Sequence, residues 1–237
     1  MPKTSRAEHY RREVSRVEGF SDAVFAFSIT LLVVSLEVPR TFHELVQAMR
    51  GFPAFAVCFA LLFQVWRRHY KFFRSYDLED SYVITLTGVL LFVVMFYVYP
   101  LKFLWSLPFS RLEGRPITSE VITVAEVPWL FLIYGAGVVA VFGILALLYG
   151  HAYRKRDELE LTPLERLATR MQIYSNVGVA GVGILSMVTA LICRKVAPNQ
   201  TGIAGFVYTG IGIVEWRVGK YHGRLRQKIS TEGTSPA

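Results

Sequence analysis

Cysteine and charged residues are both scarce in this sequence. The chain has 237 residues, and its two cysteines, Cys58 and Cys193, each lie within an apolar run. We therefore expect no disulfide, and the spacing of His, Cys, Asp and Glu matches no metal site. Charged residues make up 19% of the chain, less than the roughly 25% of a typical soluble domain. The apolar runs hold no cluster of ionisable residues of the kind that an enzyme needs, so neither catalysis nor a cofactor is expected.

Hydrophobic residues are abundant, and their grouping is the main signal. They make up 53% of the chain, and the mean hydropathy is +0.38. They fall into long runs, and about 20 apolar residues in a helix cross the hydrocarbon core of a bilayer. The runs cover residues 19–38, 52–66, 81–101, 128–150, 171–193 and 202–216. This pattern predicts an all-α integral membrane protein with six transmembrane helices, and a loop over residues 102–126.

Proline and capping residues mark the ends of several runs. Pro39 ends the first run and Pro53 opens the second, as proline suits the first turn of a helix but not its interior. Asp80 or Ser81 can cap the third helix. Thr162 followed by Pro163 and Glu165 matches a capping box, which predicts a helical lead-in to the fifth run.

The basic residues predict the orientation. There are 26 Lys and Arg against 18 Asp and Glu, a formal charge of +8. Of these, 19 fall in the N-terminal segment, the loops after the second and fourth runs and the C-terminal tail, and seven fall on the other side. This bias places both termini in the cytoplasm. The predicted organisation is a segment 1–15, a membrane domain 16–218 and a basic tail 219–237. Membrane lipids are the expected partner of these charges, and nucleic acid is not.

Polar residues inside the runs require partners. Asp22 lies just inside the first run, where an ionisable side chain is costly without one. Arg67, Arg68 and His69 are candidate partners because they lie at the same cytoplasmic level. Interhelical hydrogen bonds are expected from the polar residues near the start of the fifth run, Gln172, Ser175 and Asn176. Glu215 is expected at the interface, paired with Arg217 or Lys220. The glycines of the last three runs are expected to allow close helix packing.

The first two runs carry a family signature. Arg16, Phe20, Ser21 and Asp22 spell R-x-x-x-F-S-D at the start of the first helix, and Trp66 with His69 spells W-x-x-H in the second. These elements resemble the transmembrane-protein-175 family of potassium channels. The resemblance extends over residues 16–39 and 52–74, and beyond them it depends mainly on the number of helices.

The resemblance implies a homotetramer whose first helices line the pore. Spacings of three, four and seven put one stripe of side chains on a single face of that helix. By the match, an apolar constriction would be formed by Phe27, Leu31 and Val34, and the Thr30 hydroxyl would lie near it. Phe27 stands where the family usually has Ile or Leu. A carbonyl filter has no support, because the chain lacks T-V-G-Y-G. The motif residues Arg16, Phe20, Ser21, Asp22, Trp66 and His69 would hold the first helix in position.

These observations predict a potassium-selective channel of the cell membrane that conducts passively as a homotetramer. Two alternatives remain open at this point. One is a proton-permeable pore, since an apolar constriction that wets transiently can pass protons. The other is a secondary cation transporter, although such proteins usually carry internal repeats and ionisable residues at the membrane midplane. The one candidate here, Asp22, lies near the membrane edge.

Overall fold

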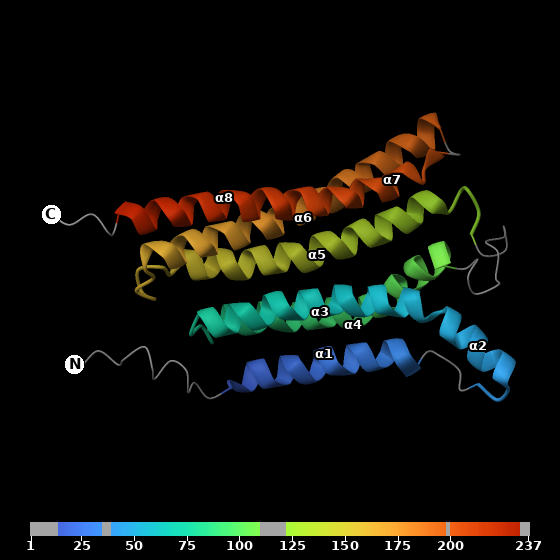
Figure 1. The fold of residues 1–237 in the computed structure, drawn as a ribbon, viewed down its shortest axis with the longest axis horizontal. Helices are drawn as coiled ribbons and strands as arrows, with labels where there is room; N and C mark the ends of the chain where they lie inside the picture. Colours follow the sequence, from blue (N-terminus) through green and yellow to red (C-terminus); the bar gives the residue numbers. More distant parts are fainter. Residues whose placement is uncertain (1–13, 35–38, 110–121, 198–199, 233–237) are drawn as a thin grey trace.

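The computed structural model describes residues 14–34, 39–109, 122–197 and 200–232, and every secondary-structure element in these segments is a helix. The all-α prediction is confirmed for this part of the chain. Its elements in chain order are α1 (Arg16–Val34), α2 (Phe42–Arg50), α3 (Phe52–Ser75), α4 (Ser81–Phe109), α5 (Val127–Arg154), α6 (Pro163–Val196), α7 (Ile203–Phe206), the 3₁₀ helix η3 (Val207–Thr209) and α8 (Gly210–Glu232). The long helices run along the longest axis, and α1 begins at the same end of the molecule where α8 ends (Figure 1).

By length and composition, fewer than the predicted six helices qualify as membrane spans. Among the described residues, α4, α5 and α6 are long and apolar enough to cross a membrane. The helices α2 and α3 pass the same test together, as a broken span or a re-entrant loop bent by 43°. The first and sixth spans stay predictions. Charged residues explain the weaker signal of α1, since Arg16, Glu18 and Asp22 all lie in its first two turns.

The predicted helix starts are confirmed. The Asp80 carboxylate accepts a hydrogen bond from the Val83 N–H at 2.9 Å, so Asp80 caps α4. Both bonds of the capping box are present at the start of α6, between Thr162 and Glu165. Capping depends on residues that are close in sequence, which is why the sequence locates these starts well.

The predicted end of the third span is wrong. The helix α4 continues to Phe109 through Pro100 and Pro108, so the first residues of the predicted 102–126 loop are helical. Proline interrupts the hydrogen-bond ladder, but neighbouring side chains can satisfy the freed backbone groups in a membrane helix. Here the Leu104 N–H donates to the Tyr134 hydroxyl at 3.0 Å, and the Cys58 thiol contacts the Leu101 carbonyl at 3.6 Å.

Two further segments differ from the simple six-run picture. Residues between the first two runs form α2, an additional helix whose start is capped by Thr41. The sixth run is divided into α7, η3 and α8, and α8 continues past residue 216 to Glu232, well into the predicted basic tail. Hydropathy alone does not detect either feature, because α2 is short and amphipathic and the end of α8 is polar.

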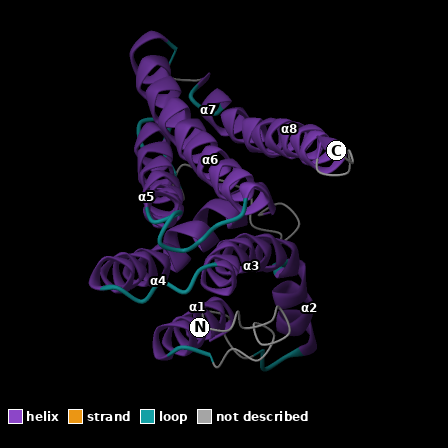
Figure 2. Ribbon diagram, turned by 90° about the vertical axis from the view of Figure 1, so that its left-hand side faces the viewer, coloured by secondary structure: helices purple, strands orange, loops and turns teal. Residues whose placement is uncertain are grey.

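The helices pack in an order that separates the two ends of the chain. Helix α1 packs on α3 and α4, α4 packs on α5, and α6 packs between α5 and α8. In both views α1 and α8 lie on opposite sides of the molecule, with α3 between them (Figures 1 and 2). Close approach of α5 and α6 requires small residues, since a Cβ at Gly135 would lie 3.0 Å from the Gly183 carbonyl oxygen. The expected packing role of the glycines is confirmed at this crossing.

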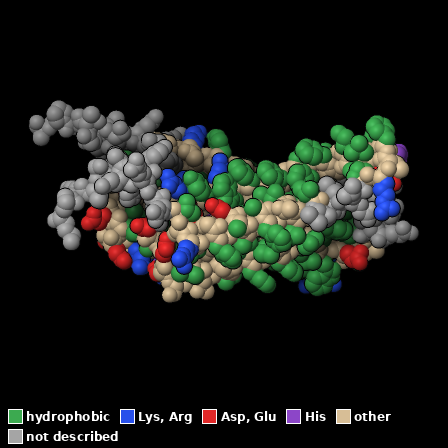
Figure 3. Space-filling model, turned by 90° about the horizontal axis from the view of Figure 1, so that it is seen from below, with side chains coloured by type: hydrophobic (Ala, Val, Ile, Leu, Met, Phe, Trp, Pro, Cys, Tyr) green, Lys and Arg blue, Asp and Glu red, His purple; other side chains and the backbone are tan. Residues whose placement is uncertain are grey.

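The outer surface matches a membrane protein. Seen from the side of α1, apolar side chains gather over the middle of the molecule, and charged side chains gather toward its ends (Figure 3). Large apolar residues on several helices are strongly exposed, including Phe92 at 71% and Phe96 at 68%. An apolar band of this kind is costly in water and favourable in lipid.

Candidate functional site: the first helix and its supports

Helix α1 has one buried face. The residues on it recur at spacings of three and four, as expected for a helix packed along one side. They are Glu18, Ser21, Phe25, Ser28 and Leu32. This face lies against α3 and α4. Because the chain buries these residues, the remaining face of α1 is directed away from α3 and α4.

Two of the predicted pore residues, Phe27 and Thr30, lie away from that buried face. Phe27 is 52% exposed, Thr30 is exposed, and Leu31 is half-buried. Val34 is the last residue of α1, and its side chain lies outside the described part of the chain. The chain therefore leaves Phe27 and Thr30 free to face lipid or neighbouring copies of the protein.

The hydroxyl groups of α1 bond to the helix itself. Ser21 donates to the Val17 carbonyl at 2.7 Å, and Thr30 donates to the Ala26 carbonyl at 2.8 Å. A hydroxyl that gives its proton to the backbone keeps oxygen lone pairs that accept contacts. The Thr30 oxygen therefore presents acceptor capacity on the exposed face of α1, as a cation requires.

Asp22 is held by Trp66. The indole Nε1–H donates to the Asp22 Oδ1 at 2.7 Å, which links α1 to α3. The contact between these two motif residues is thus present, whereas the candidates Arg67 and Arg68 are not the partners found. The Trp66 ring lies between Phe63 and Tyr70, with centroids 5.2 Å and 5.4 Å away. These neighbours restrict the ring, so the donor has a defined direction.

The other motif residues take different positions. His69 is buried, and its ring packs against Phe25 of α1 at 5.8 Å and against Phe73 at 4.9 Å. Its Nε2 atom has no hydrogen-bond partner within the described residues. Arg16 and Phe20 are exposed at the start of α1. The structure therefore brings Asp22 and Trp66 into direct contact, and His69 meets α1 through an apolar ring contact.

A polar cluster between α3, α6 and α8 was not predicted as a unit. Arg68 donates to Ser175 at 2.9 Å, to Asn176 at 3.0 Å and to Glu215 at 2.5 Å. The expected interhelical bonding of Ser175 and Asn176 is confirmed, while that of Gln172 stays a prediction. The expected pairing of Glu215 with Arg217 or Lys220 is wrong. The prediction chose those residues because they are close to Glu215 in the sequence. The fold instead brings Arg68 to Glu215 across 147 residues.

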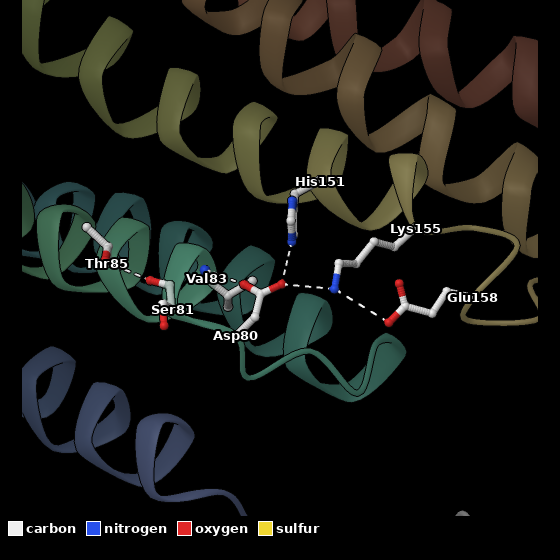
Figure 4. A network of polar contacts seen from close by, with 7 residues as sticks. All are labelled: Asp80, Ser81, Val83, Thr85, His151, Lys155 and Glu158. Atoms are coloured by element: carbon white, nitrogen blue, oxygen red, sulfur yellow. Dashed lines mark hydrogen bonds and ion pairs between the residues drawn. The ribbon is translucent and has the colours of Figure 1, made fainter.

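A second polar network joins α4 to the end of α5, at the end of the molecule where α1 begins and α8 ends (Figure 1). The Asp80 carboxylate contacts the His151 Nε2 at 2.6 Å and the Lys155 Nζ at 3.3 Å, and Lys155 also reaches Glu158 (Figure 4). Partial burial opposes ionisation of Asp80, but its hydrogen bonds from Val83, His151 and Lys155 prevail and lower its pKa to about 2. Asp80 therefore stays a carboxylate and links the two helices.

The described residues contain no group of three or more His, Cys, Asp or Glu that could hold a metal ion. The polar groups gather instead at helix contacts, where they connect one helix to the next. Around α1, these contacts support one helix.

Comparison with known proteins gives consistent matches. The family of the endosomal/lysosomal potassium channel TMEM175 matches residues 16–97, which include Asp22 and Trp66. A potassium channel of Marivirga tractuosa is 38% identical over 205 residues, covering 83% of each chain. A potassium channel of Chamaesiphon minutus is 33% identical over 98 residues, which cover 37% of this chain and 47% of that protein.

Solved structures are similar over nearly the whole chain. A crystal structure of a variant of the potassium channel MtTMEM175, in complex with a nanobody–MBP fusion protein, matches with a TM-score of 0.78 and 34% identity. The match covers 94% of this chain and 98% of that one. A TMEM175 homologue from Chamaesiphon minutus matches with a TM-score of 0.56 at 21% identity, covering 90% and 99% of the two chains. The second match supports the fold alone.

Proposed function

Because this chain belongs to the TMEM175 family of potassium channels, we propose that it conducts potassium passively across the cell membrane as a homotetramer. Membership in a channel family, together with 38% identity to a potassium channel over 83% of the chain, agrees with the expectation that it is no enzyme. Each subunit would span the membrane six times, with both termini in the cytoplasm.

The exposed face of α1 is the observation that carries the proposal. Helix α1 buries one face within its own subunit and leaves Phe27 and Thr30 outside it. If equivalent faces from four copies meet at a common axis, these side chains line a pore. The aromatic ring of Phe27, together with Leu31 and Val34, would form its apolar constriction.

An apolar constriction of this kind can select between cations. A ring of apolar side chains closes a pore by expelling water, or passes an ion that has shed part of its hydration shell. Shedding water costs less for potassium than for sodium, because the larger ion holds its water more weakly. The lone pairs of the Thr30 oxygen, left free by its bond to Ala26, would replace part of the lost hydration.

The bond between Asp22 and Trp66 supports this role without touching the ion. It anchors the first turns of α1 to α3 at 2.7 Å. The exposed face of α1 keeps its rotation about the helix axis only while this anchor and the buried face are both in place. We therefore assign Asp22 and Trp66, with Ser21 and His69, a role in positioning the pore helix.

Potassium flux from proteoliposomes tests the constriction. We expect Phe27→Ser to raise flux by on the order of tenfold, which corresponds to lowering the barrier by about 1.4 kcal/mol, because a hydroxyl at the constriction favours wetting. Phe92→Ser is the matched control, since Phe92 is a similarly exposed phenylalanine, 71% against 52%, on α4. Equal flux in both variants and the unmodified protein would refute the constriction.

The same vesicles distinguish the two alternatives. A pH-sensitive dye inside them reports proton flux, which a proton-permeable pore shows in the absence of potassium. A secondary transporter instead couples potassium movement to a second ion and saturates at low potassium concentration. Flux set only by the potassium gradient, with discrimination against sodium, supports the channel.

A further inference from the structure

Four consecutive residues of α3 connect the two sides of the molecule. Trp66 donates to Asp22 of α1, and the ring of His69 packs on α1. Between them, the Arg68 side chain reaches α6 and α8, and its backbone carbonyl accepts a hydrogen bond from Tyr149 of α5 at 3.0 Å. Residues 66–69 thus contact α1, α5, α6 and α8, although α1 and α8 lie on opposite sides of the molecule (Figure 2).

The contact between Arg68 and Glu215 is unusual for its position. The Arg68 side chain is 11% exposed and the Glu215 side chain is 38% exposed. A charged side chain that is largely removed from water is costly unless an opposite charge and hydrogen bonds compensate it. Each member therefore depends on the other, and the guanidinium also lies 5.3 Å from the centre of the Phe142 ring. Moving α8 away from α3 separates the two charges.

Helices α6 and α8 also approach each other closely at Gly178 and Val214. A Cβ at Gly178 of α6 would lie 2.5 Å from the Val214 side chain of α8, so the two helices approach closely only because residue 178 is glycine. Val214 immediately precedes Glu215. Ser175, one turn before Gly178, donates to Glu215 at 2.7 Å. The backbone crossing and the polar contacts thus place Glu215 where Arg68 reaches it.

We propose that Arg68 is a positioning residue that couples the placement of α8 to the orientation of the pore helix. A displacement of α8 that breaks the pair with Glu215 would disturb α3 at residues 66–69, and through Trp66 it would loosen the hold on Asp22. The C-terminal helix would then regulate conduction from the far side of the subunit. This inference rests on the proposed pore role of α1.

Removing one charge of the pair Arg68 and Glu215 should lower potassium flux, whereas removing both should largely restore it. Arg68→Met and Glu215→Met each leave an uncompensated charge, so we expect either to reduce potassium flux by on the order of tenfold. The double variant removes both charges, and its flux should return to within about threefold of the unmodified protein. Glu215→Gln is a milder variant that keeps an oxygen toward Ser175 and Arg68, and it should lower flux less than Glu215→Met. Flux unchanged in every variant, or equally low in the singles and the double, would overturn the proposal.

A double-mutant cycle separates coupling from a purely structural effect. If Arg68 acts through Trp66, the effects of Arg68→Met and Trp66→Phe on the potassium-to-sodium flux ratio should be non-additive. The control cycle pairs Trp66→Phe with Asp80→Asn, which lies in the separate network between α4 and α5. The effects of these two variants on the flux ratio should be additive. Additivity in both cycles contradicts the coupling. The Phe27→Ser variant tests the pore itself. If it raises potassium flux while Arg68→Met and Trp66→Phe prove additive, only the coupling is rejected and the proposed pore stands.

Discussion

Replacing Trp66 by phenylalanine removes one hydrogen bond and keeps most of the ring. In the structure the indole N–H is the donor to Asp22 Oδ1 at 2.7 Å, a distance typical of a strong charge-assisted bond. Phenylalanine retains the contacts with Phe63 and Tyr70 but leaves the half-buried carboxylate without this donor. The variant therefore isolates the polar part of the contact between α1 and α3.

The expected cost follows from that geometry. A hydrogen bond to a charged group contributes about 1.5–3 kcal/mol, so we take ~2 kcal/mol as the loss in the free energy of unfolding. In a chain of this length, that loss lowers the midpoint of thermal unfolding by about 4–8 °C. The unfolding of purified protein in detergent, followed by intrinsic fluorescence, measures the shift. Potassium flux should change as well, because α1 loses its anchor.

Trp216→Phe is the control for the change in ring size. Trp216 lies on α8, and its side chain is 62% exposed, so the same substitution there should shift the midpoint by less than about 1 °C. Asp22→Asn provides a second comparison, since its side-chain oxygen can still accept the indole N–H but carries no charge. Equal midpoints for Trp66→Phe and Trp216→Phe would show that the bond contributes nothing, and the anchoring role of Asp22 would be lost.

Two further predictions concern the supports outside α1. Asp80→Ala removes a helix cap and the contact with His151, so we expect a loss of about 1–2 kcal/mol in stability, whereas Asp80→Asn keeps the capping oxygen and should cost less. The pKa of Asp80 is lowered from 3.8 to about 2. Its stabilising contribution is therefore complete above about pH 4 and disappears as the pH falls through about 2. The unfolding midpoints of the unmodified protein and Asp80→Asn should converge as the pH falls from about 4 to about 2. Gly137→Ala would place a Cβ 2.0 Å from the Tyr97 ring and should cost about 1–3 kcal/mol. Gly143→Ala, with no described heavy atom within 4 Å of its Cβ position, should be neutral or stabilise by up to ~1 kcal/mol; equal midpoints for the two glycine variants would contradict the close packing of α5.

Features encoded by neighbouring residues could be predicted well. The caps at Asp80 and Thr162 are present as expected, because a capping side chain bonds to backbone groups two or three residues away. The helix α4 was predicted to end near Leu101, where the apolar run stops at Lys102, but it continues to Phe109. In this added part of the helix, the Leu104 N–H donates to the hydroxyl of Tyr134 on another helix. That partner is invisible in the local sequence.

The candidate site divides in the same way. The motif elements in α1 and α3 contained the two residues that meet at 2.7 Å, Asp22 and Trp66. The sequence did not reveal the bond from Arg68 to Glu215, since charge and spacing favoured the nearer Arg217 and Lys220. Only the packing of α8 on α6, with glycine at position 178, brings Glu215 to α3.

The sequence alone determined that this chain is helical, that it belongs in a membrane and which residues start its helices. These properties follow from hydropathy and from short-range hydrogen bonding, which depend on residues adjacent along the chain. The tertiary structure decided which face of α1 is buried, and so which side chains remain for a pore. It also decided which charges pair between helices, because a buried charge takes the partner that helix packing brings within reach.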